Sequence, residues 1–185
     1  MRIGKAVQLT VVVVVIVVAI LVLSWYRPGC APSPTADITF TIALDRDGRV
    51  RTAYNIGSIP ATLLIDKEGI IRDGRLGPFG SQEALMSWLD DVTSSEAEPP
   101  PSGVDPLIRP AAPDFTLPTL NGGTVELSQL RGKWVLLTFW TTWCRGCQIL
   151  MPHLQAAFEE KGGEIEFIGI NIGESEEKVR KHIEG

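Results

Sequence analysis

The chain has few of the residues that most often build metal sites and multi-disulfide scaffolds. Its 185 residues include three cysteines and two histidines. Three cysteines cannot form the several disulfides of a small secreted scaffold. A closed zinc site around Cys144 and Cys147 needs two further ligands, and His153 and His182 are the only histidines. We therefore expect no metal and no cofactor, with half of a zinc site as the alternative interpretation of the cysteine pair.

The chain also lacks any block of like charge. Its 17 basic and 22 acidic residues give a formal net charge of −5 and form no basic stripe, which argues against a nucleic-acid partner. A glycine-rich nucleotide-binding motif is missing as well. Any electrons that the protein passes on must therefore come from a thiol donor.

Charged side chains are absent between Ala6 and Tyr26, where valine and isoleucine dominate. Twenty-one residues in a helix span about 31 Å, the thickness of a bilayer core. A cleaved signal peptide is the alternative, but its apolar core is normally shorter, and no good small-x-small cleavage site follows because Pro28, Pro32 and Pro34 crowd the region. We expect a transmembrane anchor over residues 1–27 and a juxtamembrane linker over 28–36.

The charges around this segment predict its orientation. Arg2 and Lys5 precede it and only Arg27 follows closely, which favours a cytoplasmic N-terminus and an extracytoplasmic remainder. Cys30 then lies beside the membrane. It is interpreted as an idle thiol, an intermolecular disulfide partner or an acylation site.

The exported part divides into two blocks, residues 37–92 and 114–185, with a linker rich in Pro, Ser, Ala and acidic residues over 93–113. The patterns of the first block predict a strand at Ile38–Asp45, a short helix at Val50–Tyr54, a hairpin of Ala61–Asp66 with Ile70–Leu76, and a helix capped by Ser81. The patterns of the second block predict a hairpin around Asn121-Gly122 and a short helix capped by Ser128. They then predict a strand at Trp134–Trp140, a helix from the cysteines to about Glu160, a strand at Glu164–Ile172 and a last helix at Ser175–Ile183.

Neither block is expected to fold alone, because each is small and would expose strand edges. The second block has the order β-α-β-α, which implies parallel strands, and the first supplies an antiparallel hairpin and a helix. Together they predict an α/β fold with one mixed sheet and helices on both faces.

Cys144 and Cys147 have the spacing of an exchanging dithiol. Such a pair needs one accessible thiolate and a second thiol close enough to resolve a mixed disulfide. Cys144 is expected at the junction of a strand and a helix, where the positive end of the helix lowers its pKa. Arg145 adds positive charge, and Gly146 lets a partner backbone approach. We expect Cys144 to be the nucleophile and Cys147 the resolving thiol.

Two stretches together carry a family resemblance. The stretch APDFTLPTLNGGTVELSQLRGKWVLLTFWTTWCRGCQILMP resembles the first half of the fold of membrane-anchored thiol-disulfide oxidoreductases of the TlpA/ResA/CcmG type. The stretch DGRVRTAYNIGSIPATLLIDKEGIIRDGRLGPFGSQEALMSWL resembles its second half. This resemblance implies a thioredoxin-like three-layer α/β/α fold. The second half comes first here, so we interpret the chain as a circular permutation, preceded by one transmembrane helix. A swapped dimer in which the halves pair between chains, and a piece of a longer tandem protein, are the alternatives.

The resemblance also implies further site residues. Trp143 matches the family's active-site tryptophan. Pro60 matches its cis-proline beside the cysteines, and Ile59 the residue whose backbone faces an extended substrate. Two family positions differ, since the buried aspartate of thioredoxins is Thr138 here and the glutamate of TlpA/ResA-type proteins is Leu150. Glu174, after the end of a neighbouring strand, is the candidate replacement as proton acceptor.

These observations favour a membrane-tethered reductase or exchanger of protein disulfides outside the cytoplasm, supplied by a membrane thiol donor. Cytochrome c maturation is the commonest context in the family. A peroxiredoxin-like thiol peroxidase is one alternative, because peroxiredoxins share the APDFTLP opening. A non-catalytic thioredoxin-fold binding or assembly module is the other.

Overall fold

The structure is a computed structural model that describes residues 38–94 and 111–184. The expected anchor, the juxtamembrane linker, Cys30 and most of the linker between the blocks lie outside the described residues. None of the helices within the two described stretches is long and apolar enough to cross a membrane.

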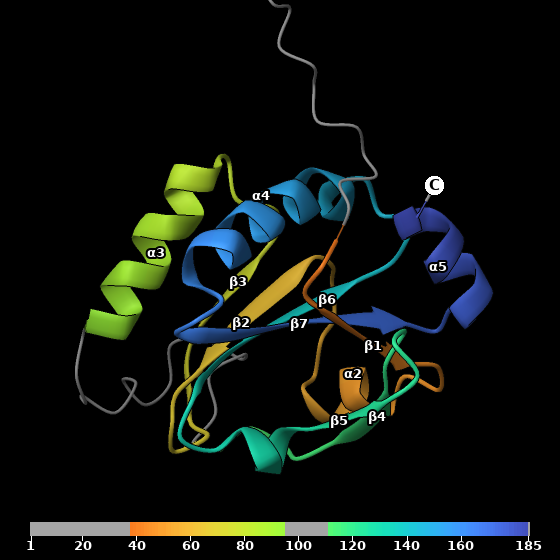
Figure 1. Cartoon of the computed structure of the whole chain (residues 1–185), viewed down its shortest axis with the longest axis horizontal. Coiled ribbons are helices and arrows are strands. Elements are labelled where there is room, and N and C mark those ends of the chain that lie inside the picture. The colour runs from red at the N-terminus through yellow and green to blue at the C-terminus, as the bar shows by residue number, and fades with distance from the viewer. Residues whose placement is uncertain (1–37, 95–110, 185) are drawn as a thin grey trace, which may run out of the picture. The chain divides into compact units, whose positions relative to one another are not determined.

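One five-stranded sheet forms the centre of the described region, in the order β1-β7-β6-β2-β3 (Figure 1). The central strands β7 and β6 are parallel, and β1 pairs with β7 in the same direction. Strand β2 is antiparallel to both β6 and β3, so the sheet is mixed. The strand bounds are Thr41–Asp45 for β1, Ala61–Ile65 for β2, Ile71–Leu76 for β3, Trp134–Trp140 for β6 and Ile165–Ile172 for β7.

The two blocks of the sequence interleave within this sheet. Strands β6 and β7 come from the second block, and β2 and β1 from the first block pair with their outer edges. Thr62 lies opposite Thr138, and Ala43 opposite Ile170. The expectation that the blocks combine into one mixed sheet is confirmed.

Three helices cover one face of the sheet. They are α3 (Gln82–Ser94), α4 (Arg145–Lys161) and α5 (Glu176–Glu184). Their buried side chains share one apolar cluster with the strands, because each helix presents an apolar stripe to the sheet. The cluster includes Ile42, Leu64, Leu85, Trp88, Leu136, Trp140, Leu150, Leu154, Phe167 and Val179.

The opposite face is covered by shorter elements than a three-layer α/β/α fold implies. These are α2 (Arg49–Ala53), the hairpin of β4 (Thr116–Pro118) and β5 (Thr124–Glu126), and the 3-10 helix η1 (Leu127–Leu130). A second apolar cluster beneath them contains Val50, Tyr54, Phe115, Leu117, Leu127, Leu137 and Phe139.

Most local signals produced the expected elements. The Asn121-Gly122 turn joins β4 to β5, with Gly122 at φ 81°, a left-handed conformation that glycine adopts readily. The Ser81 hydroxyl accepts the N–H of Ala84 at 3.2 Å and caps α3. The expected cap at Ser128 is wrong: η1 already begins at Leu127, and the Ser128 hydroxyl donates to Glu126 instead.

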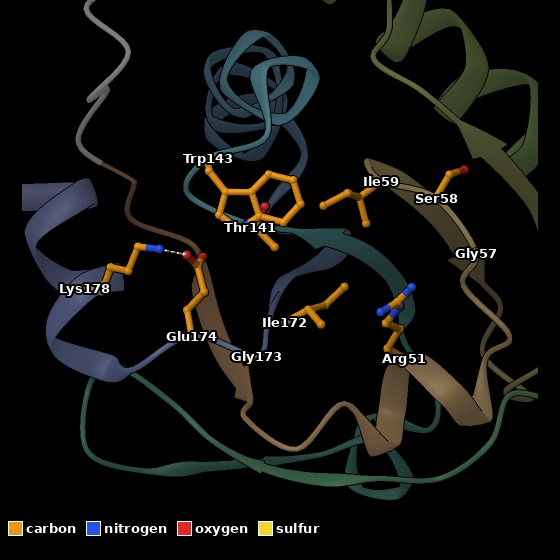
Figure 2. Close-up of a pocket in the computed structure, with 10 residues that line it drawn as sticks. All are labelled: Arg51, Gly57, Ser58, Ile59, Thr141, Trp143, Ile172, Gly173, Glu174 and Lys178. Carbon is orange, nitrogen blue, oxygen red and sulfur yellow. Dashed lines mark ion pairs between the residues drawn. The ribbon is translucent and has the colours of Figure 1, made fainter.

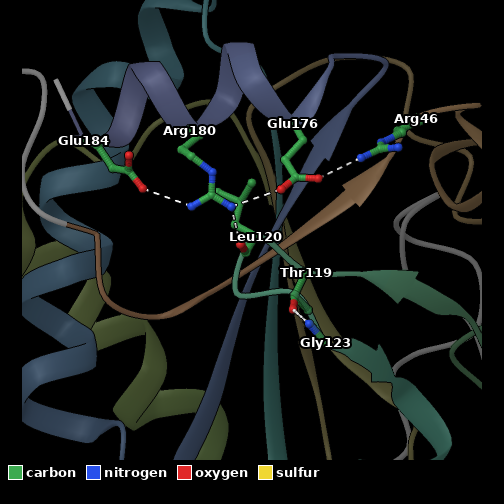
Figure 3. Close-up of polar contacts among 7 residues, drawn as sticks. All are labelled: Arg46, Thr119, Leu120, Gly123, Glu176, Arg180 and Glu184. Atoms are coloured by element: carbon green, nitrogen blue, oxygen red, sulfur yellow. Dashed lines mark hydrogen bonds and ion pairs between the residues drawn. The ribbon is translucent and has the colours of Figure 1, made fainter.

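A chain of ion pairs joins the two blocks at the edge of the sheet (Figure 3). Arg46, which follows β1, pairs with Glu176 at the start of α5 at 3.0 Å. Arg180 bridges Glu176 and Glu184, both at 3.0 Å, and also donates to the carbonyl of Leu120. The side chains are partly exposed, so these contacts fix the position of α5 more than they stabilise the fold.

Candidate active site

Cys144 lies where the central strand β6 gives way to helix α4. Strand β6 ends at Trp140, the loop Thr141–Trp143 follows, and Cys144 is the residue that caps α4. Its sulfur accepts the N–H of Cys147 at 3.2 Å. The free N–H groups and the positive end of α4 therefore meet at this sulfur, and both stabilise a thiolate there.

Cys144 and Cys147 form a disulfide, with their Cα atoms 5.2 Å apart. Cys144 is 7% exposed and Cys147 is 1% exposed. The pair is thus in its oxidised state. Cys144, the residue expected to be the nucleophile, is the more exposed of the two.

The first block reaches this disulfide through the segment that precedes β2. The Ile59–Pro60 peptide bond is cis, as expected. Pro60 is buried, and a Cβ atom on Gly146 would lie 3.1 Å from Cδ of Pro60. Residues more than eighty positions apart in the sequence therefore meet, and glycine at position 146 permits the close approach.

The residues flanking the cysteines differ in exposure. The Trp143 side chain is 68% exposed, which is unusual for a large aromatic residue. Arg145 is also exposed, on the first turn of α4. On the same helix, Gln148 donates to the carbonyl of Thr142 at 2.9 Å. This contact fixes the loop and leaves the Trp143 ring in solvent.

Glu174, which follows β7, is 7% exposed and binds the same loop. Its carboxylate accepts the Thr142 N–H at 2.7 Å and the Thr142 hydroxyl at 2.8 Å. It also accepts the Asn171 amide at 2.9 Å and pairs with Lys178 at 2.6 Å. Burial raises the pKa of Glu174, but these hydrogen bonds outweigh burial and leave the pKa below its ordinary value.

These contacts bear on the expected role of Glu174 as a proton acceptor. Among the described residues, its hydrogen bonds go to Thr142, Asn171 and Lys178, and none joins it to either cysteine. A carboxylate with a lowered pKa is also a weak base. The geometry therefore favours a positioning role, in which Glu174 holds the loop before Cys144.

The two positions that depart from the family pattern provide no carboxylate. Thr138 is buried in β6, and its hydroxyl lies 3.3 Å from that of Thr62 on β2. Leu150 is fully buried in the apolar cluster of α4. Packed side chains therefore fill both positions, and neither position offers a proton acceptor of the kind found in the family.

A pocket of about 470 Å³ opens beside the disulfide (Figure 2). Its rim combines the loop before β2, the loop before Cys144, and the residues that follow β7. It is lined by Arg51, Gly57, Ser58, Ile59, Thr141, Trp143, Ile172, Gly173, Glu174 and Lys178.

Seven of these ten lining residues were not predicted from the sequence, among them Arg51, Thr141 and Lys178. Arg51 lies on α2 and Lys178 on α5, and neither belongs to a local motif. Thr141 lies in the loop between β6 and α4. The sheet order brings α2 and α5 to the same edge as the cysteines, and only the topology reveals it. Within the described part of the chain, no group of three or more His, Cys, Asp or Glu side chains is placed to hold a metal ion.

Comparison with known proteins gives matches over part of the chain. Residues 108–185 match the model of the AhpC/TSA family. The thiol-disulfide oxidoreductase ResA of Bacillus subtilis (strain 168) is 40% identical over 72 residues, which cover 38% of this chain and 39% of that protein. ResA of Geobacillus kaustophilus (strain HTA426) is 41% identical over 75 residues, covering 40% and 42%. The thioredoxin-like protein YneN of Bacillus subtilis (strain 168) is 36% identical over 70 residues, covering 38% and 41%.

The chain therefore spans about two-fifths of the length of the curated relatives that it matches. The matched family region, residues 108–185, contains the cysteine pair, strands β6 and β7, and helices α4 and α5. In sequence, this part of the chain is similar to thioredoxin-like thiol-disulfide oxidoreductases and to the AhpC/TSA family.

Proposed function

We propose that the protein is a membrane-tethered thiol-disulfide oxidoreductase that reduces or exchanges protein disulfides outside the cytoplasm. The observation that carries the proposal is the Cys144–Cys147 disulfide at the N-terminus of α4, where Gly146 between the cysteines lies close to Pro60 from the other block. The names of the relatives support the same chemistry. The uncharged stretch from Ala6 to Tyr26 supports the tether.

The reaction follows from the positions of the two sulfurs. In the reduced protein, the Cys144 thiolate attacks one sulfur of the substrate disulfide, and the other substrate sulfur leaves as a thiolate. That leaving thiolate takes the proton of Cys147. The Cys147 thiolate then attacks the Cys144 sulfur, and the bond between Cys144 and the substrate breaks. The second substrate sulfur leaves as a thiolate and takes up from solvent the proton that Cys144 released when it ionised. The products are a substrate dithiol and the Cys144–Cys147 disulfide, so two electrons and two protons have passed to the substrate.

The same site supports the binding of an extended substrate. Ile59 is half-buried beside Pro60 and lines the pocket next to the disulfide. A polypeptide that runs along its backbone would place its own cysteine at Cys144. A membrane thiol donor would return the disulfide to the dithiol, and apocytochrome cysteines are the substrate suggested by the family resemblance.

We also propose that the chain is a circular permutation that folds as a monomer. Strands of the first block flank the two central strands of the second block in one sheet, although the family-matched region follows the first block in the sequence. The alternative is a swapped dimer, in which the same pairings form between two chains.

The test is to equilibrate the full-length protein in graded thiol–disulfide buffers and to count free thiols by alkylation and mass spectrometry. We expect a reversible two-electron transition between about −180 and −300 mV. The Cys147→Ser variant is expected to accumulate a mixed disulfide with a model substrate, whereas Cys144→Ser forms none. Equal trapping by both variants would contradict the assigned roles.

Two results would redirect the function. A disulfide that never exchanges would make the protein a thioredoxin-fold binding module. Turnover of peroxide at Cys144, with no exchange of protein disulfides, would make it a thiol peroxidase.

A further inference from the structure

We propose that the pocket beside the Cys144–Cys147 disulfide binds a carboxylate of the substrate, so that the protein prefers disulfides flanked by an acidic residue. This inference rests on the proposed function and adds the class of substrate to it.

Two cationic side chains from different elements line the pocket. Arg51 projects from α2 and Lys178 from α5, on opposite sides of the pocket in Figure 2. Of the other lining residues, only Glu174 carries a charge. Its carboxylate is already bound by Thr142, Asn171 and Lys178 and is nearly buried. The pocket therefore presents a net positive charge to a ligand.

Arg51 is held in place at both its backbone and its side chain. Its N–H donates to the carboxylate of Asp45 at 2.8 Å, and its Nε donates to the carbonyl of Ile56 at 3.0 Å. The terminal nitrogens of the guanidinium extend into the pocket (Figure 2). A planar guanidinium fixed in this way is suited to binding a carboxylate through two parallel hydrogen bonds.

The Thr141 hydroxyl provides an independent sign of a ligand. Thr141 is 3% exposed, lines the pocket, and its Oγ1 has no hydrogen-bond partner among residues 38–94 and 111–184. A buried hydroxyl without a partner costs about 1–3 kcal/mol. After a rotation of the Thr141 side chain that exposes Oγ1 to the pocket, a carboxylate oxygen of the substrate would accept its hydrogen bond.

The rest of the lining fits the stem of an acidic side chain. Ile59, Ile172 and Trp143 supply apolar surface, against which methylene groups of glutamate or aspartate can pack. Ile59 and Trp143 immediately precede Pro60 and Cys144 in the sequence. A substrate carboxylate bound in the pocket would therefore belong to a residue only a few positions away from the substrate cysteine that reacts with Cys144.

The experiment uses the reduced full-length protein and a set of short peptides, each oxidised to its symmetrical disulfide. The peptides are identical except for Glu, Gln or Lys at one of the three positions on either side of the cysteine. Each rate constant is divided by the rate of the same peptide with dithiothreitol, which removes differences in intrinsic reactivity.

At one or more positions, we expect the Glu peptide to react about 3–10-fold faster than the Gln peptide, and the Lys peptide to be slowest. The preference should fall as salt is added, because the pocket is open to solvent. It should disappear in Arg51→Gln and return in Arg51→Lys. Arg49→Gln is the matched control, since Arg49 lies on the same helix, pairs with Asp47 at 2.6 Å and does not line the pocket.

Equal rates for Glu, Gln and Lys peptides at every position would overturn this inference and leave the proposed function standing. A preference for Glu that persists unchanged in Arg51→Gln would overturn it as well. Failure of every peptide to react would overturn the proposed function, and the inference with it.

Discussion

At the scale of single residues, Glu174 holds the loop that leads into Cys144. The Glu174→Gln substitution removes the charge that pairs with Lys178 and weakens the bonds to Thr142. We expect the free energy of unfolding to fall by about 1–3 kcal/mol, measured by urea denaturation. Disulfide exchange should slow because the loop is less fixed.

Glu184→Gln provides the control for this change. Glu184 lies on α5, pairs with Arg180 at 3.0 Å, and its side chain is 62% exposed. Exposed pairs of this kind contribute little, about 0–1 kcal/mol. Equal losses of stability in the two variants would contradict the role assigned to Glu174.

The lowered pKa of Glu174 adds a dependence on pH to the same comparison. A carboxyl whose pKa is lower in the folded than in the unfolded state contributes stability above its ordinary pKa of about 4.3. That contribution is lost as the pH falls through the folded pKa. The difference in unfolding free energy between wild type and Glu174→Gln should therefore be constant near neutral pH and shrink below about pH 4.3. If this difference in unfolding free energy stayed constant down to pH 3, the result would contradict a lowered pKa for Glu174.

Single residues also show where sequence reasoning succeeds. Cys144, Cys147 and the cis bond at Pro60 belong to short motifs whose neighbours in the sequence identify them. Arg51 and Lys178 could not be predicted in the same way, because a charge on a short helix has no local feature that separates a binding residue from a solvated one.

At the scale of elements, the start of α4 depends on a close approach between the blocks. A Cβ atom on Gly146 would lie 3.1 Å from Cδ of Pro60 and 3.5 Å from Cδ of Pro78. Replacing a helical glycine by alanine normally stabilises a protein by about 0.4–1 kcal/mol. In Gly146→Ala we expect this gain to be cancelled by crowding against Pro60, and exchange with protein substrates to slow.

The measurement is urea denaturation of Gly146→Ala beside the rate of reduction of a model protein disulfide. If Gly146→Ala gained about 0.4–1 kcal/mol in unfolding free energy and its exchange rate were unchanged, the crowding against Pro60 would be absent, which would contradict this prediction.

Regular elements with strong periodicity were the most predictable. Strand β6 covers Trp134–Trp140 as expected, because a continuous apolar run indicates a strand buried on both faces. Helix η1 was assigned the wrong start, since a single turn of 3-10 helix has no apolar periodicity and Ser128 has a nearer partner in Glu126. The sequence pattern predicted helices on both faces, whereas short elements cover the second face. The sequence of a turn or a short hairpin does not indicate which face of the sheet it covers.

At the scale of the whole molecule, the two blocks should fold in either order. Ile38 and Thr39, before β1, line the same small pocket as Ile183 and Glu184 at the end of α5. A chain in which residues 111–184 come first, followed by a short Gly/Ser connector and residues 38–94, should therefore form the same sheet. We expect a monomer whose exchange rate is within about threefold of that of a matched fragment in the present order.

The measurement is light scattering together with the exchange assay on both chains. A dimer in the present order and a monomer in the rearranged order would show that the blocks pair between chains. Failure of the rearranged chain to fold would contradict the proposed permutation.

The order of the blocks also decides when the reactive thiols meet their partner during synthesis. A ribosome delivers the Ile59–Pro60 segment some eighty residues before Cys144. Strand β6 emerges just before the cysteines and β7 after them. The first block therefore waits with β1 and one edge of β2 unpaired, whereas Cys144 and Cys147 appear when the surface that will cover them is already present. In the reverse order the thiols would be exposed for the longer time. The present order thus shortens the period in which a nascent thiol can be captured by the wrong partner.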